Sequence, residues 1–505
     1  MRSTRFVEAM VLTIAILSSG VVFLDQTAVN VALPAIQTAL NADFGALQWI
    51  LDIYLLVLSV LMLIGGVLGD IYGRVRVYVI GMVIFALASI VCGLAPDTGW
   101  LITGRFFQGV GGALIAPAGL AIISAVIPPD RRGRMLGIWG TFSPLITVSG
   151  PLVGGWLVDN VSWRAIFFIN IPLCFLATLI AHFYVPENRD ETASRQLDWM
   201  GVVTLMFGLT GVLVGLIEGP HFGWRSPLVL GGFIIGVLGL IAFVWTESRV
   251  ENPLIPLSLF KIRPFTGVNL LTVIMFAGLG GPFFFLTLNF QQVQGYSAAH
   301  AGLATIPTTI AIFLLSRFVG QLADKYSPRP ILILATLLMM TGFFMFSRIG
   351  IDEPYWTVWF PAILVYGLGL ATMVVPLTTI ALGALPQRQS GIASGINNAA
   401  SRIGQMLSVA IFGGVMVNQF RVSLINQSDV LGIPKNVRDN LATQARSLGN
   451  LQPPAGLELE AEQAIQQMIR VAFVDGFQLV MLLSMILVFI SLIILLLTIP
   501  KRVSD

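Results

Sequence analysis

The chain has 505 residues, of which 56% are hydrophobic and only 10% are charged, and its formal net charge is +3. A soluble globular protein is roughly 25% charged, so lipid rather than water must surround most of this apolar surface. The small net charge gives no indication of a nucleic-acid partner, and no G-x-x-x-x-G-K-S/T phosphate loop occurs. Cys92 and Cys174 exclude a disulfide framework, and no carboxylate pair, metal cluster or nucleophile beside a base can be assembled. We therefore expect neither an enzyme nor a bound cofactor.

Apolar windows long enough to cross a bilayer recur along the whole chain, and each is expected to form a transmembrane helix. A span needs about 20 apolar residues to cross about 30 Å of hydrocarbon. The first window follows Arg2 and Arg5 and is too long for a removable signal peptide, so we expect it to be the first span. The count of fourteen falls to twelve if the pair within 199–247 is not fully inserted, and the fold class is all-α and polytopic in either case. The windows are 9–34, 47–69, 76–95, 101–127, 135–158, 165–185, 199–218, 228–247, 265–290, 301–322, 330–348, 357–383, 391–417 and 474–498.

The distribution of basic residues predicts the orientation in the membrane. With the N-terminus inside, cytoplasmic segments hold most of the lysines and arginines, whereas the short external loops hold only Arg164, Arg225 and Arg348. We therefore expect a bacterial cytoplasmic (inner) membrane protein with both termini in the cytoplasm. The long polar segment 418–473 is then external, and two interpretations stay open for it: a solvated cap, or a docking surface for a periplasmic adaptor.

An internal repeat divides the chain into two related halves. The sequence GVLGD at 66–70 returns as GQLAD at 320–324, each at the cytoplasmic end of the second span of a six-span set. Repeated halves with a binding site at their interface near the bilayer midplane are the usual plan of secondary transporters. The predicted domains are an N-terminal six-helix half (1–198), two inserted helices with a cytoplasmic linker (199–263), and a C-terminal six-helix half (264–505).

Four motifs carry a resemblance to a known family. They are LDQTAVNVALP at 24–34, GVLGDIYGRVR at 66–76, GRFFQG at 104–109 and GPLVGG at 150–155. In these motifs the chain resembles the major facilitator superfamily, and within it the fourteen-helix drug:proton antiporters of the EmrB/QacA type. The resemblance implies the fold of this superfamily, which consists here of two six-helix halves plus two inserted central helices.

Three charged residues within apolar runs are candidates for proton coupling. Asp25 lies well inside the first span, where a carboxylate is costly unless it faces water, finds a partner or binds a proton. Asp52 lies nearer the outer end of the second span, where a position at a wet cavity mouth is the alternative to a functional role. Arg105 in the fourth span is always charged, and the resemblance implies that it takes part in a proton relay with Gln108 one turn away.

The resemblance also implies which spans form the walls of the central cavity. They are the first and fourth spans and their counterparts in the second half, and an apolar, aromatic surface with few polar groups suits varied lipophilic ligands. The residues expected to contact substrate are Asp25, Asn30, Phe107, Gln108, Phe283, Asn289, Tyr366 and Thr378.

A third group of residues is expected to act in the conformational change. Gly66, Asp70, Gly73 and Arg74 form a short cytoplasmic turn. Small residues and a proline in the fifth span allow close helix packing, which would be the moving seam between the halves; they are Gly150, Pro151, Gly154 and Gly155. Arg402, midway along the thirteenth span, needs a carboxylate, a carbonyl or an anionic substrate that the sequence does not identify.

These observations together predict a proton-coupled antiporter that exports lipophilic, often cationic, toxic compounds by alternating access. The alternative on the same fold is an exporter of one endogenous metabolite, or a lipid flippase. Protons are the expected coupling ion. The expected partners are small lipophilic substrates and the lipid bilayer, and the chain is expected to act as a monomer unless segment 418–473 binds an adaptor.

Overall fold

The computed structural model describes residues 4–189, 196–325, 327–386, 389–431, 433–454 and 458–499, and all regular structure in these ranges is helical. Thirteen segments of the described chain are long and apolar enough to cross a membrane. The remaining expected span, 135–158, lies within a further helix of 32 residues, Pro129–Asn160. The predicted all-helical polytopic fold is therefore confirmed.

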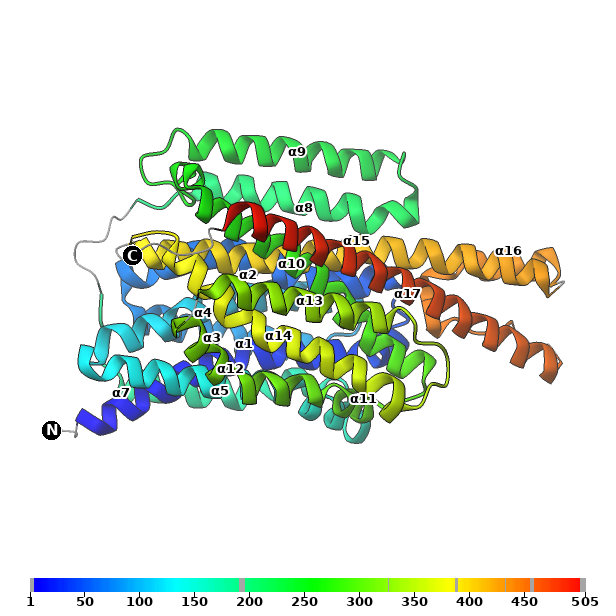
Figure 1. Cartoon of the computed structure of the whole chain (residues 1–505), viewed down its shortest axis with the longest axis horizontal. Helices are drawn as coiled ribbons and strands as arrows, with labels where there is room; N and C mark the ends of the chain where they lie inside the picture. Colours follow the sequence, from blue (N-terminus) through cyan, green and yellow to red (C-terminus); the bar gives the residue numbers. More distant parts are fainter. Residues whose placement is uncertain are drawn as a thin grey trace.

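The first half of the chain forms a bundle whose helices run roughly parallel to the long axis of the molecule (Figure 1). Its polar connections are short, and Asp43 and Asp97 cap the helices that follow them by accepting backbone N–H bonds. The expected sixth span is broken after Ile169, because Pro172 has no N–H to donate to the preceding turn. The elements are α1 (Thr4–Leu40), α2 (Phe44–Tyr72), α3 (Arg74–Gly93), α4 (Thr98–Val126), α5 (Pro129–Asn160), α6 (Ala165–Phe168) and α7 (Asn170–Tyr184).

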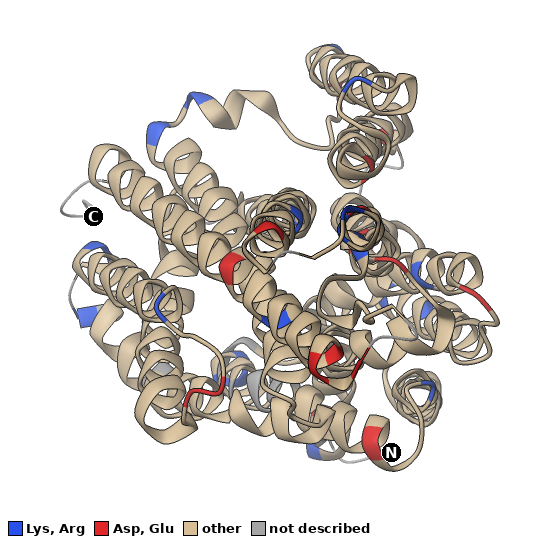
Figure 2. Ribbon diagram, turned by 90° about the vertical axis from the view of Figure 1, so that its right-hand side faces the viewer, with Lys and Arg blue, Asp and Glu red and all other residues tan. Residues whose placement is uncertain are grey.

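The inserted pair, α8 (Trp199–Phe222) and α9 (Pro227–Glu247), lies at the edge of the molecule (Figures 1 and 2). Both helices are rich in glycine where they face each other. A Cβ atom on Gly211 would lie 2.4 Å from the backbone nitrogen of Gly236, so only a glycine permits this approach. Small residues that bring backbones together are the usual basis of helix association in lipid. Helix α8 also packs on α2 and α15, whereas most of the α9 surface is open.

The second half contains the remaining bundle helices and an extension at one end of the molecule. Two of its helices are longer than the sequence predicts: the thirteenth span continues to Val430 and the last begins at Leu459, so both project beyond the other helix ends (Figure 1). The extensions pack on each other through buried apolar side chains. The elements are η1 (Leu257–Lys261), α10 (Arg263–Leu288), η2 (Asn289–Val293), α11 (Ala298–Ala304), α12 (Ile306–Lys325), α13 (Pro328–Phe346), η3 (Tyr355–Trp359), α14 (Phe360–Gly383), α15 (Ser390–Val430), α16 (Lys435–Thr443), η5 (Ala445–Asn450) and α17 (Leu459–Thr498).

Charged residues are sparse along the helices (Figure 2). Only a few of their side chains are buried in the interior of the bundle. Because a buried charge in a membrane protein needs a partner or a function, these few positions define where the chemistry lies. Asp25 and Arg105 are both fully buried, and they come from different helices of the first half.

Candidate functional site

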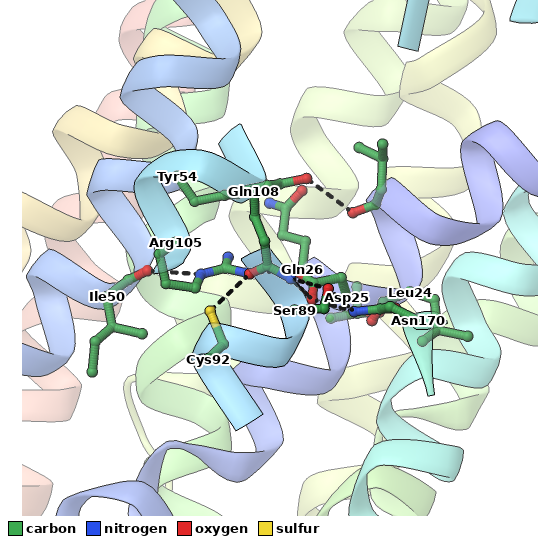
Figure 3. A network of polar contacts seen from close by, with 12 residues as sticks. Leu24, Asp25, Gln26, Ile50, Tyr54, Ser89, Cys92, Arg105, Gln108 and Asn170 are labelled. Atoms are coloured by element: carbon green, nitrogen blue, oxygen red, sulfur yellow. Dashed lines mark hydrogen bonds and ion pairs between the residues drawn. The ribbon is translucent and has the colours of Figure 1, made fainter. Parts of the chain in front are cut away.

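Asp25 is the centre of a buried polar network formed by helices of the first half (Figure 3). Its Oδ2 atom forms an ion pair with Arg105 Nη1, and both side chains are fully buried. Its Oδ1 atom accepts hydrogen bonds from Asn170 Nδ2 at 2.8 Å and from Gln108 Nε2 at 3.1 Å. Both carboxylate oxygens are therefore satisfied by donors from α4 and α7, as a buried charge requires.

Arg105 and Gln108 lie three residues apart on α4, so they occupy the same face of the helix. Arg105 donates from Nη1 to Gln108 Oε1 at 2.7 Å and from Nε to the carbonyl of Ile50 at 3.1 Å. Its guanidinium also lies 4.2 Å from the ring centroid of Tyr54, where a cation–π contact adds stabilisation. Arg105 Nη2 is buried and has no hydrogen-bond partner in the part of the chain that the structure describes, which leaves one side of the guanidinium available.

Two residues that the sequence analysis did not single out complete this network. Ser89 on α3 accepts a bond from Gln108 Nε2 at 2.9 Å, and Asn170 is the first residue of α7. Asn170 lies two residues before Pro172. A polar residue close to a proline that interrupts an apolar span was the sequence feature that could have indicated its role. Ser89 had none, because an isolated serine in an apolar helix normally bonds its own backbone.

A small central cavity of about 40 Å³ lies beside the network, between the two halves. Arg105 and Tyr54 form its wall on one side, and Gln405 on α15 and Phe284 on α10 form the other. The predicted residue Asn30 lines it, whereas Leu51, Leu55, Gly280 and Val409 are lining residues that the sequence did not identify. Two larger hollows, of about 550 and 440 Å³, lie away from the network, beside η3 and between α8 and α15 respectively.

Arg402 finds its partner across this interface. Its Nη1 atom donates to Gln26 Oε1 at 2.6 Å, and Gln26 Nε2 donates to Gln405 Oε1 at 3.2 Å. The guanidinium also lies 5.1 Å from the ring centroid of Phe23. Since Gln26 is the neighbour of Asp25 in the chain, this contact connects α15 directly to the segment that carries the ion pair.

Asp25 and Gln108 belong to the polar network but do not line this cavity, and the other five residues expected to contact substrate lie outside both. Phe107 is half exposed beside Phe106, and Thr378 is exposed and bonds to its own helix backbone. The remaining three are interior residues of the second half, and none of them lines the small cavity. Phe283 is partly buried next to the lining residue Phe284, Asn289 accepts a bond from Gln294, and Tyr366 packs on Phe343.

Asp52 does not join the network, and it is fully buried rather than at a wet cavity mouth. Neither of its carboxylate oxygens has a hydrogen-bond partner among the described residues. Asp52 is buried because the preceding turn of the same helix binds two other helices. Gln48 Nε2 donates to the carbonyl of Val409 on α15 at 2.7 Å, and Trp49 Nε1 donates to Glu218 on α8 at 3.0 Å. This face of α2 is thus covered by α15 and by the inserted helix α8, which the sequence alone did not place.

The turn between α2 and α3 is held by a segment that follows α7. Gly73 has φ +106°, which an L-residue rarely adopts, and Glu187 accepts the backbone N–H groups of Val75 and Arg76 at 3.0 Å each. Asp70 pairs with Arg74 at 2.8 Å. Gly66 faces α4, where the nearest contact of a Cβ atom would be 3.9 Å away. The repeat counterpart of Asp70, at position 324, lies outside the described side chains.

The small residues of α5 contact both halves of the molecule. A Cβ atom on Gly150 would lie 1.9 Å from Thr27 Oγ1 on α1, and one on Gly154 would lie 2.9 Å from α1 as well. On the other side, a Cβ atom on Gly155 would lie 2.5 Å from the carbonyl of Ala298 on α11. The carbonyl of Pro151 would be 2.4 Å from a Cβ atom on Gly302 of α11. Helix α5 therefore forms a close-packed seam between the halves.

Comparison with known proteins settles the family. The sequence profile of the Major Facilitator Superfamily matches residues 15–198 and 192–409. The chain belongs to the major facilitator superfamily. It is thus a multi-pass membrane transporter rather than an enzyme, and the predicted superfamily and fold are confirmed.

Named relatives and a solved structure agree with this assignment. The chain is 34% identical over 403 residues to the multidrug resistance protein Stp of Mycobacterium tuberculosis, which covers 78% of this chain and 73% of that protein. It is 30% identical over 459 residues to the tetracenomycin C resistance and export protein of Streptomyces glaucescens, covering 90% and 85%. The fold matches an inward-facing bacterial homologue of the human lysosomal transporter Spinster, with a TM-score of 0.69, 16% identity and 97% of each chain covered.

Proposed function

We propose that this transporter is a proton-coupled antiporter of the fourteen-helix drug-exporting branch, which carries lipophilic and often cationic compounds out of the cell by alternating access. The observation that carries the proposal is the fully buried ion pair between Asp25 and Arg105, because Arg105 forms part of the wall of the central cavity. In this arrangement one protonation event changes the charge that the cavity presents to a substrate.

The charge change follows from the chemistry of the two groups. With Asp25 ionised, the pair is neutral; with Asp25 protonated, the pair carries one positive charge, because an arginine stays charged. A cationic substrate roughly 8 Å away would then be repelled by about 2 kcal/mol at an effective dielectric constant of about 20. Proton binding at Asp25 therefore favours release of a cation, and release of the proton favours its binding, as exchange in opposite directions requires.

The carboxylate of Asp52 on α2 provides a second candidate for the coupling proton. Asp52 is fully buried and without hydrogen-bond partners among the described residues, at the face of α2 covered by α8 and α15. Intramembrane carboxylates of this kind mark proton pathways. We assign the main coupling step to Asp25, because its carboxylate forms an ion pair with Arg105 of the cavity wall, whereas the Asp52 carboxylate has no hydrogen-bond partner among the described residues.

The conformational change is proposed to separate the seam formed by α5 and α11. Asp159 on α5 accepts the backbone N–H groups of Ala298 and Ala299 at 3.1 and 2.8 Å, next to the Gly155 contact. Arg446 in the external segment pairs with Asp43 at 2.8 Å, so this end of the molecule is closed. An exporter must open this end to release substrate, and these contacts must then break.

The names of the relatives support export of toxic compounds, since one is a multidrug resistance protein and another a resistance and export protein. The cavity wall combines aromatic surface from Tyr54 and Phe284 with polar side chains, namely Gln26, Asn30, Arg105 and Gln405. We place the chain in the bacterial inner membrane with both termini in the cytoplasm, so that segment 418–473 is external. Within that segment Arg446 contacts the rest of the chain, which favours a cap over an adaptor site.

The test is efflux of a lipophilic cation such as ethidium in everted vesicles under an imposed proton gradient. We expect gradient-driven transport by the wild type and its loss in Asp25→Asn. Asp97→Asn is the matched control, because Asp97 is an exposed helix cap and asparagine caps a helix equally well. Intact transport in Asp25→Asn would refute the role of Asp25, and absence of transport in the wild type would favour a dedicated metabolite or lipid substrate.

A further inference from the structure

Two buried carboxylates meet at one end of the inserted helix pair, far from the Asp25 network. Asp198 immediately precedes α8 and Glu247 is the last residue of α9, and they are only 6% and 4% exposed. The sequence analysis predicts no carboxylate pair, because these residues lie at opposite ends of a helical hairpin whose closure brings them together.

Each carboxylate uses one of its oxygens to bind a backbone N–H group. Asp198 Oδ1 accepts from Gly201 at 2.7 Å and caps α8, and Glu247 Oε2 accepts from Ile255 in the following linker at 2.9 Å. The other two oxygens, Asp198 Oδ2 and Glu247 Oε1, are buried and have no hydrogen-bond partner among the described residues. Both would lie 2.5 Å from a Cβ atom on Gly201, so they point at the same small space.

Two ionised carboxylates in this geometry would repel each other, and no donor of the described residues lies between their two facing oxygens. Removing a charge from water without a partner is strongly unfavourable, and two adjacent carboxyl groups usually resolve this by holding one proton between them. Ca²⁺ takes six to eight oxygen ligands, and only two carboxylate oxygens of the described residues are free here. Mg²⁺ would have to keep several bound waters, for which two almost fully buried carboxylates leave little access.

No basic side chain of the described residues is directed at the pair. Arg249, on the next turn, is exposed and lies over the ring of Trp245 at 5.5 Å. Glu251 is exposed as well. Helices α2 and α15 pack on α8. Among their charged side chains, Asp70 pairs with Arg74, and Arg402 donates to Gln26. Asp52 lies one turn from Trp49, which bonds Glu218 in the opposite half of α8.

We propose that Asp198 and Glu247 form a proton-binding site, in which one proton is shared between Asp198 Oδ2 and Glu247 Oε1. The shared proton joins the start of α8 to the end of α9, and the bond from Ile255 to Glu247 fixes the linker toward α10 at the same point. Loss of the proton leaves two like charges in contact and loosens this junction. The site is thus a pH-sensitive contact between the inserted pair and the second half.

The test compares thermal unfolding of the purified full chain with that of Glu247→Gln and Asp198→Asn, between about pH 6 and about pH 9. Each amide keeps the backbone hydrogen bond of its residue and supplies an N–H in place of the shared proton. The stabilising proton is present at low pH and is lost as pH rises. The unfolding temperature of the wild type is therefore expected to fall as pH rises, relative to the unfolding temperatures of both variants, so that the difference between them widens. Glu251→Gln, at an exposed neighbouring position, should follow the wild type.

Infrared spectroscopy gives a second readout that does not depend on stability. The carbonyl stretching band of a protonated, water-inaccessible carboxyl group at neutral pH should lose one component in both amide variants. Equal pH dependence of all the proteins together with an unchanged band would overturn the proposal. Stabilisation of the wild type by Na⁺ or Mg²⁺ that the amide variants lose would also overturn it, in favour of a metal ion. Neither readout uses transport, so the result is independent of the proposed antiport.

Discussion

Replacing Asp25 by asparagine removes the counter-charge of Arg105 while keeping the size of the side chain. The guanidinium is fully buried and would retain only Gln108, the carbonyl of Ile50 and the ring of Tyr54 as partners. Removing one member of a buried ion pair destabilises a protein by about 3–5 kcal/mol, because the other charge is left uncompensated. We therefore expect Asp25→Asn to lower the stability of the folded state by this amount.

A second substitution distinguishes this cause from simple loss of packing. In the double variant Asp25→Asn with Arg105→Gln, no charge remains, and replacing a buried pair by neutral groups is often close to neutral. The double variant should therefore be more stable than Asp25→Asn alone, with a coupling free energy of about 2–3 kcal/mol in the double-mutant cycle.

The assay is thermal unfolding of the wild type, Asp25→Asn, Arg105→Gln and the double variant in detergent at one pH and salt concentration. Asp70→Asn provides the control, because its pair with Arg74 is partly exposed and should contribute at most about 1 kcal/mol. The reasoning would be refuted if Asp25→Asn were as stable as the wild type, or if the double variant were less stable than the single one.

Three further perturbations test other parts of the account. Gly155→Val places side-chain atoms within 2.5 Å of the α11 backbone, so it should hold the external end open; increased labelling of a cysteine introduced at position 30 would report this, and unchanged labelling would contradict it. Gly73→Ala combines a φ of +106° with a Cβ atom 2.7 Å from the Glu187 carboxyl and should destabilise the chain by at least about 1 kcal/mol, measured by thermal unfolding; a neutral effect would show that the turn relaxes. Arg446→Gln breaks the pair with Asp43, whose carboxylate is partly exposed, and should cost no more than about 1 kcal/mol yet raise the rate of amide exchange at the start of α2; unchanged exchange would remove the external segment from the closing contacts.

The sequence predicts the helical fold well, because apolar runs of about 20 residues leave few alternatives in a membrane protein. The sequence is less informative where helices continue beyond their apolar runs. Helices α15 and α17 extend beyond the expected spans because their outer turns pack on each other, and hydropathy does not report such packing.

The candidate site could be predicted only in part. Asp25, Arg105 and Gln108 stand out as polar residues in apolar helices, and the structure places them in contact. Ser89 gives no comparable signal. The burial of Asp52 depends on the position of α8 against α2, which is a tertiary property. The pairing of Asp198 with Glu247 likewise requires the closed hairpin, since residues distant in sequence carry no periodicity that joins them.

The central claim is that proton and substrate exchange at Asp25. The most direct measurement is proton release on substrate addition, with purified protein in a weakly buffered detergent solution and a pH-sensitive dye. At a pH where part of the protein carries the coupling proton, addition of ethidium should release protons from the wild type and none from Asp25→Asn. If ethidium binds the wild type without proton release, or if Asp25→Asn releases as many protons as the wild type, exchange at Asp25 is contradicted.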